Sequence, residues 1–247
     1  MQMQRRIDWA KINKIVEETP EVKTFLIDVP EDFTWEEGAH THFALKGFNE
    51  GEGPNRELIR HMSISTLPNE GAIGITTRIK ELCSEFKSIL KTIEIGTEVA
   101  LFKTHSNMPL KEEGKNIYFL TAGVGIATVR PLALKYLQND TNVPSIHSLN
   151  VDSSAQYVFT DVFTTNEEKN FTAQYVNSRD AFYAEVTRLV QADKDGIYYI
   201  VGSNDFLKEN IALLREHGVE TSQMMIDKRA SFLEEFFGAE AANVEVK

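Results

Sequence analysis

Cysteine is almost missing from this sequence, since Cys83 is the one cysteine among 247 residues. A single thiol excludes an internal disulfide, and it excludes any metal or iron–sulfur site built from cysteines alone. Long apolar runs are missing too, because none approaches the roughly 20 residues that a membrane-spanning helix needs. Arg5 and Arg6 near the N-terminus are not followed by an apolar stretch, so we expect no signal peptide and a cytoplasmic protein.

Positive charge is also scarce, because 26 lysines and arginines face 37 aspartates and glutamates and leave a net charge of −11. We therefore expect no nucleic-acid-binding surface, although local groups can still bind an anionic cofactor. His40 and His42 would share a strand face, but no third ligand is nearby in the sequence. Since a metal ion usually needs three or four ligands, we predict no metal site.

The first part of the chain is typical of an all-β domain. Short alternating or β-rich runs are separated by turn formers such as Pro20, Gly38 and Gly96, a spacing that indicates a barrel or sandwich. A helical insert is expected over residues 81–90, and Ser84 near its first turn lies beside backbone N–H groups suited to an anion. The expected strands are residues 11–18, 22–29, 41–46, 60–66, 72–78 and 97–102.

The composition changes after a polar segment that contains Pro109 and Gly114. Strands and helices then alternate, which implies a parallel sheet covered by helices on both faces. The expected strands are residues 116–120, 145–151, 171–176, 197–201 and 224–226, and the expected helices are 129–137, 181–190 and 206–217. We therefore predict a two-domain protein with an antiparallel β-barrel over residues 1–105, a linker over 106–115 and an α/β domain with a parallel sheet over 116–247.

Two stretches suggest chemistry. In residues 60–66 a cation precedes three hydroxyls that alternate with apolar residues, as on a half-buried strand; the run is Arg60-His61-Met62-Ser63-Ile64-Ser65-Thr66. Gly123-Val124-Gly125 lies between a predicted strand and a predicted helix, where glycines let a nucleotide approach the backbone and the helix N-terminus attracts phosphate. This is not a full G-x-G-x-x-G, and a tight turn that needs glycine for packing is an equally good interpretation.

With both stretches in the correct order, the chain resembles the ferredoxin–NADP⁺ reductase-like flavoprotein family over nearly its whole length. Residues 60–63 resemble the family's Arg-x-Tyr-Ser/Thr motif, and residues 75–78 with 84–86 resemble the strand and helix start that hold the flavin pyrophosphate. Residues 121–128 resemble its glycine-rich nicotinamide turn, and residues 198–203 resemble the strand that ends in Cys-Gly-Pro in many members. The resemblance implies a flavin-binding barrel followed by a domain that binds a nicotinamide nucleotide.

The resemblance also implies a role for each matching residue. Arg60 would pair with the flavin phosphate, Ser63 would hydrogen-bond the flavin near its reactive nitrogen as the catalytic residue, and Met62 would lie against the ring. The expected flavin-binding residues are Arg60, His61, Met62, Ser63, Ile64, Thr76, Thr77, Arg78, Ser84 and Glu85. The expected nucleotide-binding residues are Gly123, Val124, Gly125, Ser178, Arg179 and Gly202, with Ser178 and Arg179 suited to the 2′-phosphate of NADPH unless Ser178 is simply a helix cap.

The expected activity is hydride transfer from NADPH or NADH to bound FAD, with electrons passed to a separate acceptor. FAD is favoured over FMN because residues 76–86 are suited to a pyrophosphate. Met62 replaces the family's stacking tyrosine and Val201 its usual cysteine, so a flavin-binding module with weak or lost turnover is the alternative. A third hypothesis is a nucleotide-binding transferase in which residues 60–66 are plain barrel.

Overall fold

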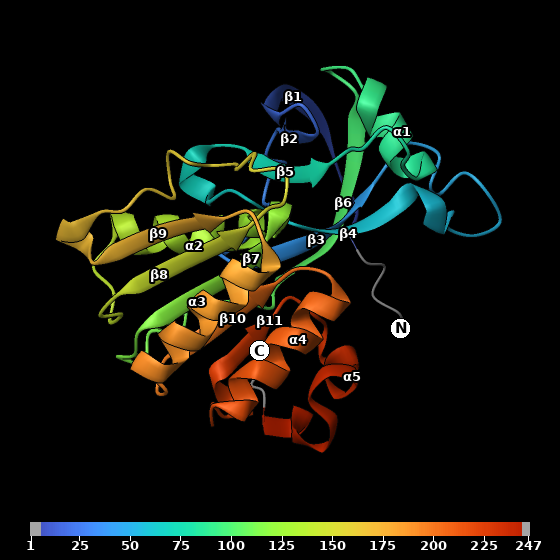
Figure 1. Cartoon of the computed structure of the whole chain (residues 1–247). Helices are drawn as coiled ribbons and strands as arrows, with labels where there is room; N and C mark the ends of the chain where they lie inside the picture. The colour runs from blue at the N-terminus through green and yellow to red at the C-terminus, as the bar shows by residue number, and fades with distance from the viewer. Residues whose placement is uncertain (1–5, 244–247) are drawn as a thin grey trace. The chain divides into compact units, whose positions relative to one another are not determined.

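The computed structural model describes residues 6–243, and the chain divides between Ser106 and Asn107 into two compact units (Figure 1). In the polar segment that was expected to be a linker, the last strand of the first unit continues to Ser106, and Met108 and Leu110 beyond it are buried. The two units are described separately below.

The first unit is a curled antiparallel sheet of six strands in the order β4-β3-β6-β1-β2-β5. The strands are β1 (Asp8–Thr19), β2 (Val22–Ile27), β3 (Ala39–Ala44), β4 (Ile59–Ser63), β5 (Ile73–Arg78) and β6 (Glu98–Ser106). The two edge strands meet where Ile64 bridges Ile75 and the Ser65 N–H donates to the Gly74 carbonyl at 2.8 Å. The predicted antiparallel barrel is thus confirmed as a partly open, curled sheet.

The interior of this sheet follows from the alternation of apolar residues along the strands. In the pairing of β2 with β5, Phe25 lies opposite Ile75, and between β3 and β6 Phe43 lies opposite Leu101. These side chains form one buried cluster, which is completed by Phe86 and Leu90 of helix α1 (Glu85–Thr92). The helix expected over residues 81–90 therefore begins late, after the extended residue Ser84, and leaves Leu82 92% exposed.

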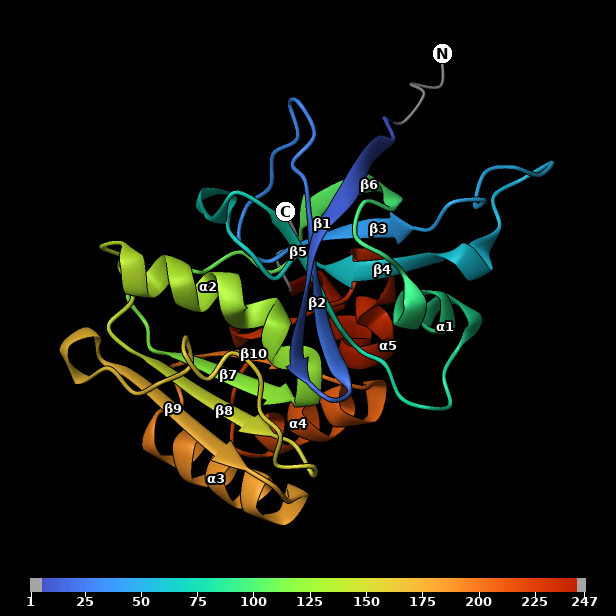
Figure 2. The same cartoon turned by 90° about the horizontal axis from the view of Figure 1, so that it is seen from above.

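The second unit is a parallel sheet of five strands in the order β11-β10-β7-β8-β9. The strands are β7 (Ile117–Ala122), β8 (Ile146–Val151), β9 (Phe171–Val176), β10 (Ile197–Val201) and β11 (Met224–Ile226). The helices are α2 (Ile126–Gln138), α3 (Arg179–Ala192), α4 (Asn204–Glu216) and α5 (Leu233–Phe237). Figures 1 and 2 show α2 on one face of the sheet and α3 and α4 on the other, which confirms the predicted α/β architecture.

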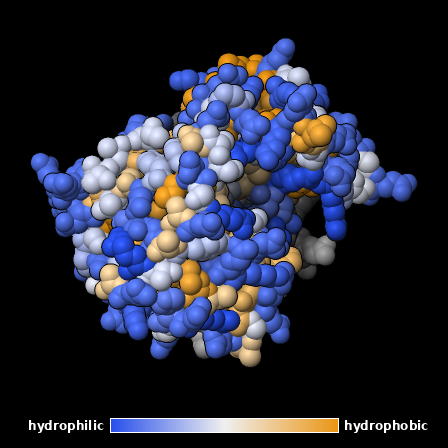
Figure 3. All heavy atoms as spheres, in the orientation of Figure 1, coloured by the Kyte–Doolittle hydropathy of each residue, from blue (hydrophilic) through white to orange (hydrophobic). Residues whose placement is uncertain are grey.

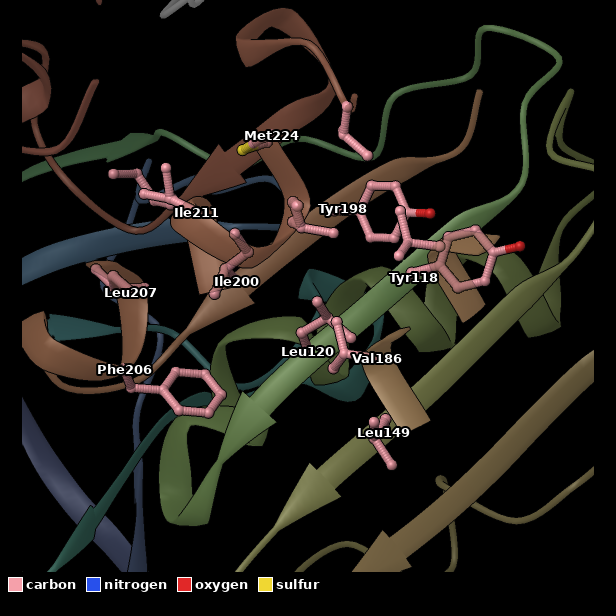
Figure 4. Close-up of a cluster of buried hydrophobic side chains, with 14 of the residues drawn as sticks. Tyr118, Leu120, Leu149, Val186, Tyr198, Ile200, Phe206, Leu207, Ile211 and Met224 are labelled. Atoms are coloured by element: carbon pink, nitrogen blue, oxygen red, sulfur yellow. The ribbon is translucent and has the colours of Figure 1, made fainter. Parts of the chain in front are cut away.

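One core layer of this unit lies between the sheet and helices α3 and α4 (Figure 4), and buried residues of α2 cover the other face of the sheet. Tyr118 and Tyr198 on neighbouring strands stack with ring centroids 4.9 Å apart, and Leu120, Ile200 and Phe206 continue the apolar layer. Such strands are buried on both faces and read as continuous apolar runs, which is why the sequence predicted them well.

Hydrophilic residues dominate the face seen in Figure 3, and hydrophobic ones form small separate groups. Across residues 6–243, we find no helix with the length and apolar character required to cross a membrane.

Candidate functional site

Strand β4 presents Arg60 and Met62 on one face and His61 on the other. Met62 packs against the barrel core, and the Arg60 guanidinium carbon lies 5.1 Å from the centre of the Phe86 ring on α1. Arg60 Nη1 donates to the carbonyls of Arg56 and Glu57, each at 3.1 Å, and Nη2 lies 3.6 Å from the Glu57 carboxylate. The side chain is one third exposed, so a positioned guanidinium faces solvent above the start of α1.

The start of α1 gathers positive charge. Burial lowers the pKa of Lys87 from its usual value, and the like charges of Arg60, Arg78 and Lys80 lower it further, against the opposing effect of Cys83. Ser84 is the N-cap residue with an extended backbone, and its hydroxyl does not cap the helix. The start of α1 therefore combines four nearby cations with the Ser84 hydroxyl and with amides that have no intrahelical acceptor, and such an arrangement is suited to an anion.

The three β5 residues expected at the flavin site have different environments. The Thr76 hydroxyl lies 2.9 Å from both the Thr24 and the Ser65 hydroxyls in a buried chain of hydroxyl groups, which is a structural arrangement. Thr77 is buried, and Arg78 at the end of the strand is half-buried and belongs to the cation group around Lys87. Arg78 is therefore the member of this trio best placed for an anion.

Ser63 and Ile64 lie where the two edges of the curled sheet meet. Ser63 is half-buried and pairs with His40 of β3, whereas Ile64 is 1% exposed and belongs to the barrel core. Ser63 therefore offers a hydroxyl at the end of β4, while the Ile64 side chain packs into the barrel core.

The fold also assembles histidines that the sequence left apart. The His40 ring lies 3.8 Å from the His61 ring and 4.0 Å from the His105 ring, and His42 lies 5.6 Å from His61. The sequence offered only the pair on β3, because His61 and His105 arrive from β4 and β6. Within residues 6–243 we find no group of three or more potential ligands placed to hold a metal ion.

In the second unit, the expected nucleotide-binding residues follow the carboxyl ends of the strands. The chain runs outward from β7 to β8 and β9 and then returns to place β10 on the other side of β7. In open parallel sheets such a reversal of strand order marks the crevice where ligands bind. The turn Gly123–Gly125 follows β7, and Gly202 follows β10, so both glycine positions lie at this switch point.

Glycine is required at Gly123, Gly125 and Gly202 for different structural reasons. Gly123 adopts a positive φ of 54°, which favours glycine. A Cβ on Gly125 would lie 2.8 Å from the Val201 carbonyl oxygen, and one on Gly202 would lie 2.5 Å from the Phe206 ring. Close packing therefore requires glycine at positions 125 and 202. Val124, between the two glycines of the turn, is half-buried.

Asn150 on β8 holds the glycine turn in place, a role that the sequence did not suggest. Its side-chain amide, which is 2% exposed, donates to the Thr121 hydroxyl at 2.8 Å and to the Gly123 carbonyl at 3.2 Å. A buried amide that bonds the end of β7 and the first residue of the turn restricts the conformations available to the turn. The sequence did hold a signal for this role, because a buried asparagine near the end of a parallel strand is unusual.

Ser178 and Arg179 begin helix α3 after β9. The Ser178 hydroxyl accepts the Ala181 N–H at 3.3 Å and so caps the helix, while its own O–H remains a donor. Arg179 Nη1 lies 2.8 Å from Glu209 Oε2 on α4, and the Tyr183 hydroxyl donates to the same oxygen. Asp180 is the carboxylate next to Arg179 in the sequence, but the fold brings Glu209 to the guanidinium from 30 residues away.

Comparison with known proteins identifies the fold. No protein-family model and no curated protein matches the sequence. The fold is that of the ferredoxin–NADP⁺ reductase-like proteins, in which a curled antiparallel sheet precedes a parallel sheet with helices. This confirms the predicted resemblance at the level of the fold.

Three of the solved structures with a similar fold are described here. The CS-b5R domains of human Ncb5or in the NAD⁺ form match with a TM-score of 0.76 at 12% identity, covering 92% of this chain and 71% of that chain. A ferredoxin–NADP⁺ reductase from Neisseria gonorrhoeae with bound FAD and NADP matches with a TM-score of 0.73 at 16% identity, covering 90% and 98%. The Plasmodium falciparum ferredoxin–NADP⁺ reductase matches with a TM-score of 0.72 at 16% identity, covering 88% and 94%.

Proposed function

We propose that this protein is a flavin-dependent oxidoreductase in which residues 1–105 bind FAD, residues 106–115 join the domains, and residues 116–247 bind NADPH or NADH. A bound flavin would supply hydride and electron transfer between the nicotinamide and a separate acceptor, a small molecule or a redox protein. The observation that carries this proposal is the group of cations at the first turn of α1: the Arg60 guanidinium lies 5.1 Å from the Phe86 ring of that helix, and Arg60, Arg78 and Lys80 are close enough to Lys87 to lower its pKa, in a chain whose net charge is −11.

The residues of the first unit fit a flavin nucleotide. A bound pyrophosphate would offset the repulsion among the cations that lowers the pKa of Lys87, since a nearby opposite charge favours the protonated amine. Arg60 would pair with one phosphate through its guanidinium, and Ser84 and the Glu85 amide would serve the other. Met62 would lie against the flavin ring, and the Ser63 hydroxyl would donate a hydrogen bond near the reactive nitrogen.

The residues of the second unit fit a nicotinamide nucleotide. The glycine turn at the switch point lets a pyrophosphate approach the backbone at the start of α2. Ser178 and Arg179 then follow a strand at the same edge of the sheet, with donors suited to the adenosine end of the nucleotide. The neighbours from Neisseria gonorrhoeae and human bind NADP and NAD⁺, respectively, which supports this class of ligand without deciding between the two.

A visible spectrum of the purified protein tests the proposal. We expect flavin absorption bands after reconstitution with FAD and their bleaching by NADPH or NADH under anaerobic conditions. A protein that is folded but retains no flavin would contradict the assignment of the first unit.

The second candidate is a flavin-binding module with weak or lost turnover. It is favoured by Met62, which offers no aromatic face, and by Val201, which is buried at the end of β10 where a cysteine would offer a thiol. Bound flavin that neither nucleotide bleaches would favour this candidate.

A further inference from the structure

The start of α3 contains a guanidinium that is already engaged by a carboxylate. Arg179 Nη1 and the Tyr183 hydroxyl both donate to Glu209 Oε2, the first at 2.8 Å. Arg179 is 54% exposed and Glu209 is 46% exposed, so both groups are accessible to a ligand. Burial and the hydrogen bond to Glu209 raise the pKa of the Tyr183 phenol, which therefore stays protonated and keeps donating.

Arg179 and Glu209 lie side by side but favour different nucleotides. A guanidinium pairs well with a 2′-phosphate, whereas a carboxylate accepts a ribose 2′-hydroxyl and repels a 2′-phosphate. The two groups come from different helices, and the carboxylate is oriented by two donors from the first turns of α3. A phosphate that approached Arg179 would meet the negative charge of Glu209 beside it and would compete with Glu209 for the Nη1 donor.

We propose that Glu209 is the residue that sets the choice between NADH and NADPH. Its carboxylate accepts the 2′-hydroxyl of NADH through Oε1, and it keeps Arg179 from the 2′-phosphate of NADPH. The inference rests on the proposed nucleotide site and adds to it a residue that opposes the NADPH preference expected from Ser178 and Arg179 alone.

The test uses two adenosine probes that need no turnover, 5′-AMP and its 2′-phosphorylated form, with dissociation constants measured by calorimetry on the full chain. Glu209→Gln keeps the size and the acceptor oxygen of the side chain but removes its charge. Because exposed ion pairs are weak, we expect binding of the 2′-phosphorylated probe to tighten by about fivefold. Binding of 5′-AMP should stay equal or weaken.

Two further variants isolate the contact. Glu216→Gln removes the same charge from an exposed position on the same helix and should leave both probes unchanged. In the Glu209→Gln background, Arg179→Ala should remove most of the gain in binding of the 2′-phosphorylated probe, because that gain comes from the guanidinium that Glu209 no longer pairs, while 5′-AMP is hardly affected. The ratio of kcat/KM for NADPH to that for NADH should rise in Glu209→Gln and return toward the parent value in the double variant.

The outcomes separate this inference from the proposed function. If both probes bind and Glu209→Gln changes them equally, or changes neither, Glu209 does not set the preference while the nucleotide site stands. If the folded parent binds neither probe at millimolar concentration, the nucleotide site itself is wrong and the inference falls with it. Thermal unfolding of each variant, expected to match the parent, checks that the comparison concerns folded protein.

Discussion

The phosphate sites proposed for the two units differ in kind. In the first unit, side-chain cations from β4, β5 and α1 lie near the start of a helix, and charge would be the main attraction. In the second unit, the turn after β7 offers backbone groups, and its shape is set by Gly125 against Val201 and by the Asn150 amide. The cation there that is suited to phosphate, Arg179, is already paired.

The difference indicates how each site should fail. A site that depends on side-chain charge loses affinity stepwise as charges are removed, and it weakens with salt. A site that depends on backbone shape tolerates salt but is disrupted by a single methyl group at a close contact. The predictions below test this contrast, beginning with the largest expected effect.

Gly125→Ala should disrupt the second unit and spare the first. The new Cβ would lie 2.8 Å from the Val201 carbonyl oxygen, and because both sides of this contact are backbone the turn must move. Overpacking of this kind costs about 1–3 kcal/mol, and a displacement of about 1 Å can lower the rate about a hundredfold. Stopped-flow flavin reduction by NADH and NADPH measures the effect.

The control is Gly53→Ala, because a Cβ at Gly53 meets nothing within 4 Å. Flavin content should be unchanged in both variants. Normal reduction rates in Gly125→Ala would contradict the view that the shape of this turn governs the nucleotide site.

Arg60→Ala tests the charge-based site. A hydrogen bond to a charged group contributes about 1.5–3 kcal/mol, so FAD binding should weaken by about tenfold or more. Arg56→Ala is the matched control, since Arg56 is exposed and its hydrogen bond with Arg60 is through its backbone carbonyl, which the substitution keeps. Equal flavin retention after dialysis in both variants and the parent would remove Arg60 from the site.

The sequence predicted both sheets because the apolar pattern within each strand depends on which of its faces are buried. Alternation in β2 and β5 and the continuous apolar runs of β7 and β10 reflect burial on one face or on two. The start of α1 was less predictable. Residues 81–83 carry a helix-like pattern, yet Ser84 takes an extended N-cap conformation and the helix begins after it.

The candidate site was predictable where one segment supplies it and unpredictable where the fold brings segments together. Residues 60–63 and 123–125 were found from their own patterns. Glu209 was missed because it reaches Arg179 from another helix, and His61 and His105 were missed as neighbours of His40 because three strands bring them together. Sequence periodicity specifies which face a residue occupies but not which distant residue shares it.

Lys87 allows a pH test of the charge-based site. Its pKa is lowered by burial and by Arg60, Arg78 and Lys80, so it loses its proton at a lower pH than a free lysine. The protonated form attracts phosphate, so FAD affinity should fall as the pH rises through this lowered pKa, by about fivefold or less for one partly exposed charge. Lys87→Arg keeps its charge and should flatten this decline. Identical pH profiles of the FAD dissociation constant in the two proteins would exclude Lys87 from the phosphate site.

The smallest expected change concerns the ring rather than the phosphates. Met62 and His61 point to opposite faces of β4, so Met62→Tyr and His61→Tyr place the same new ring on the two sides of one strand. Sulfur–aromatic and aromatic–aromatic contacts are of similar size, so Met62→Tyr should change FAD affinity by less than about threefold. It should nevertheless shift the flavin absorption bands and quench flavin fluorescence, because a phenol then lies against the ring, whereas His61→Tyr should leave both spectra unchanged. The opposite pattern, or no shift in either variant, would place the flavin ring away from Met62. The charge-based phosphate contacts would then be the only part of the proposed flavin site that stands.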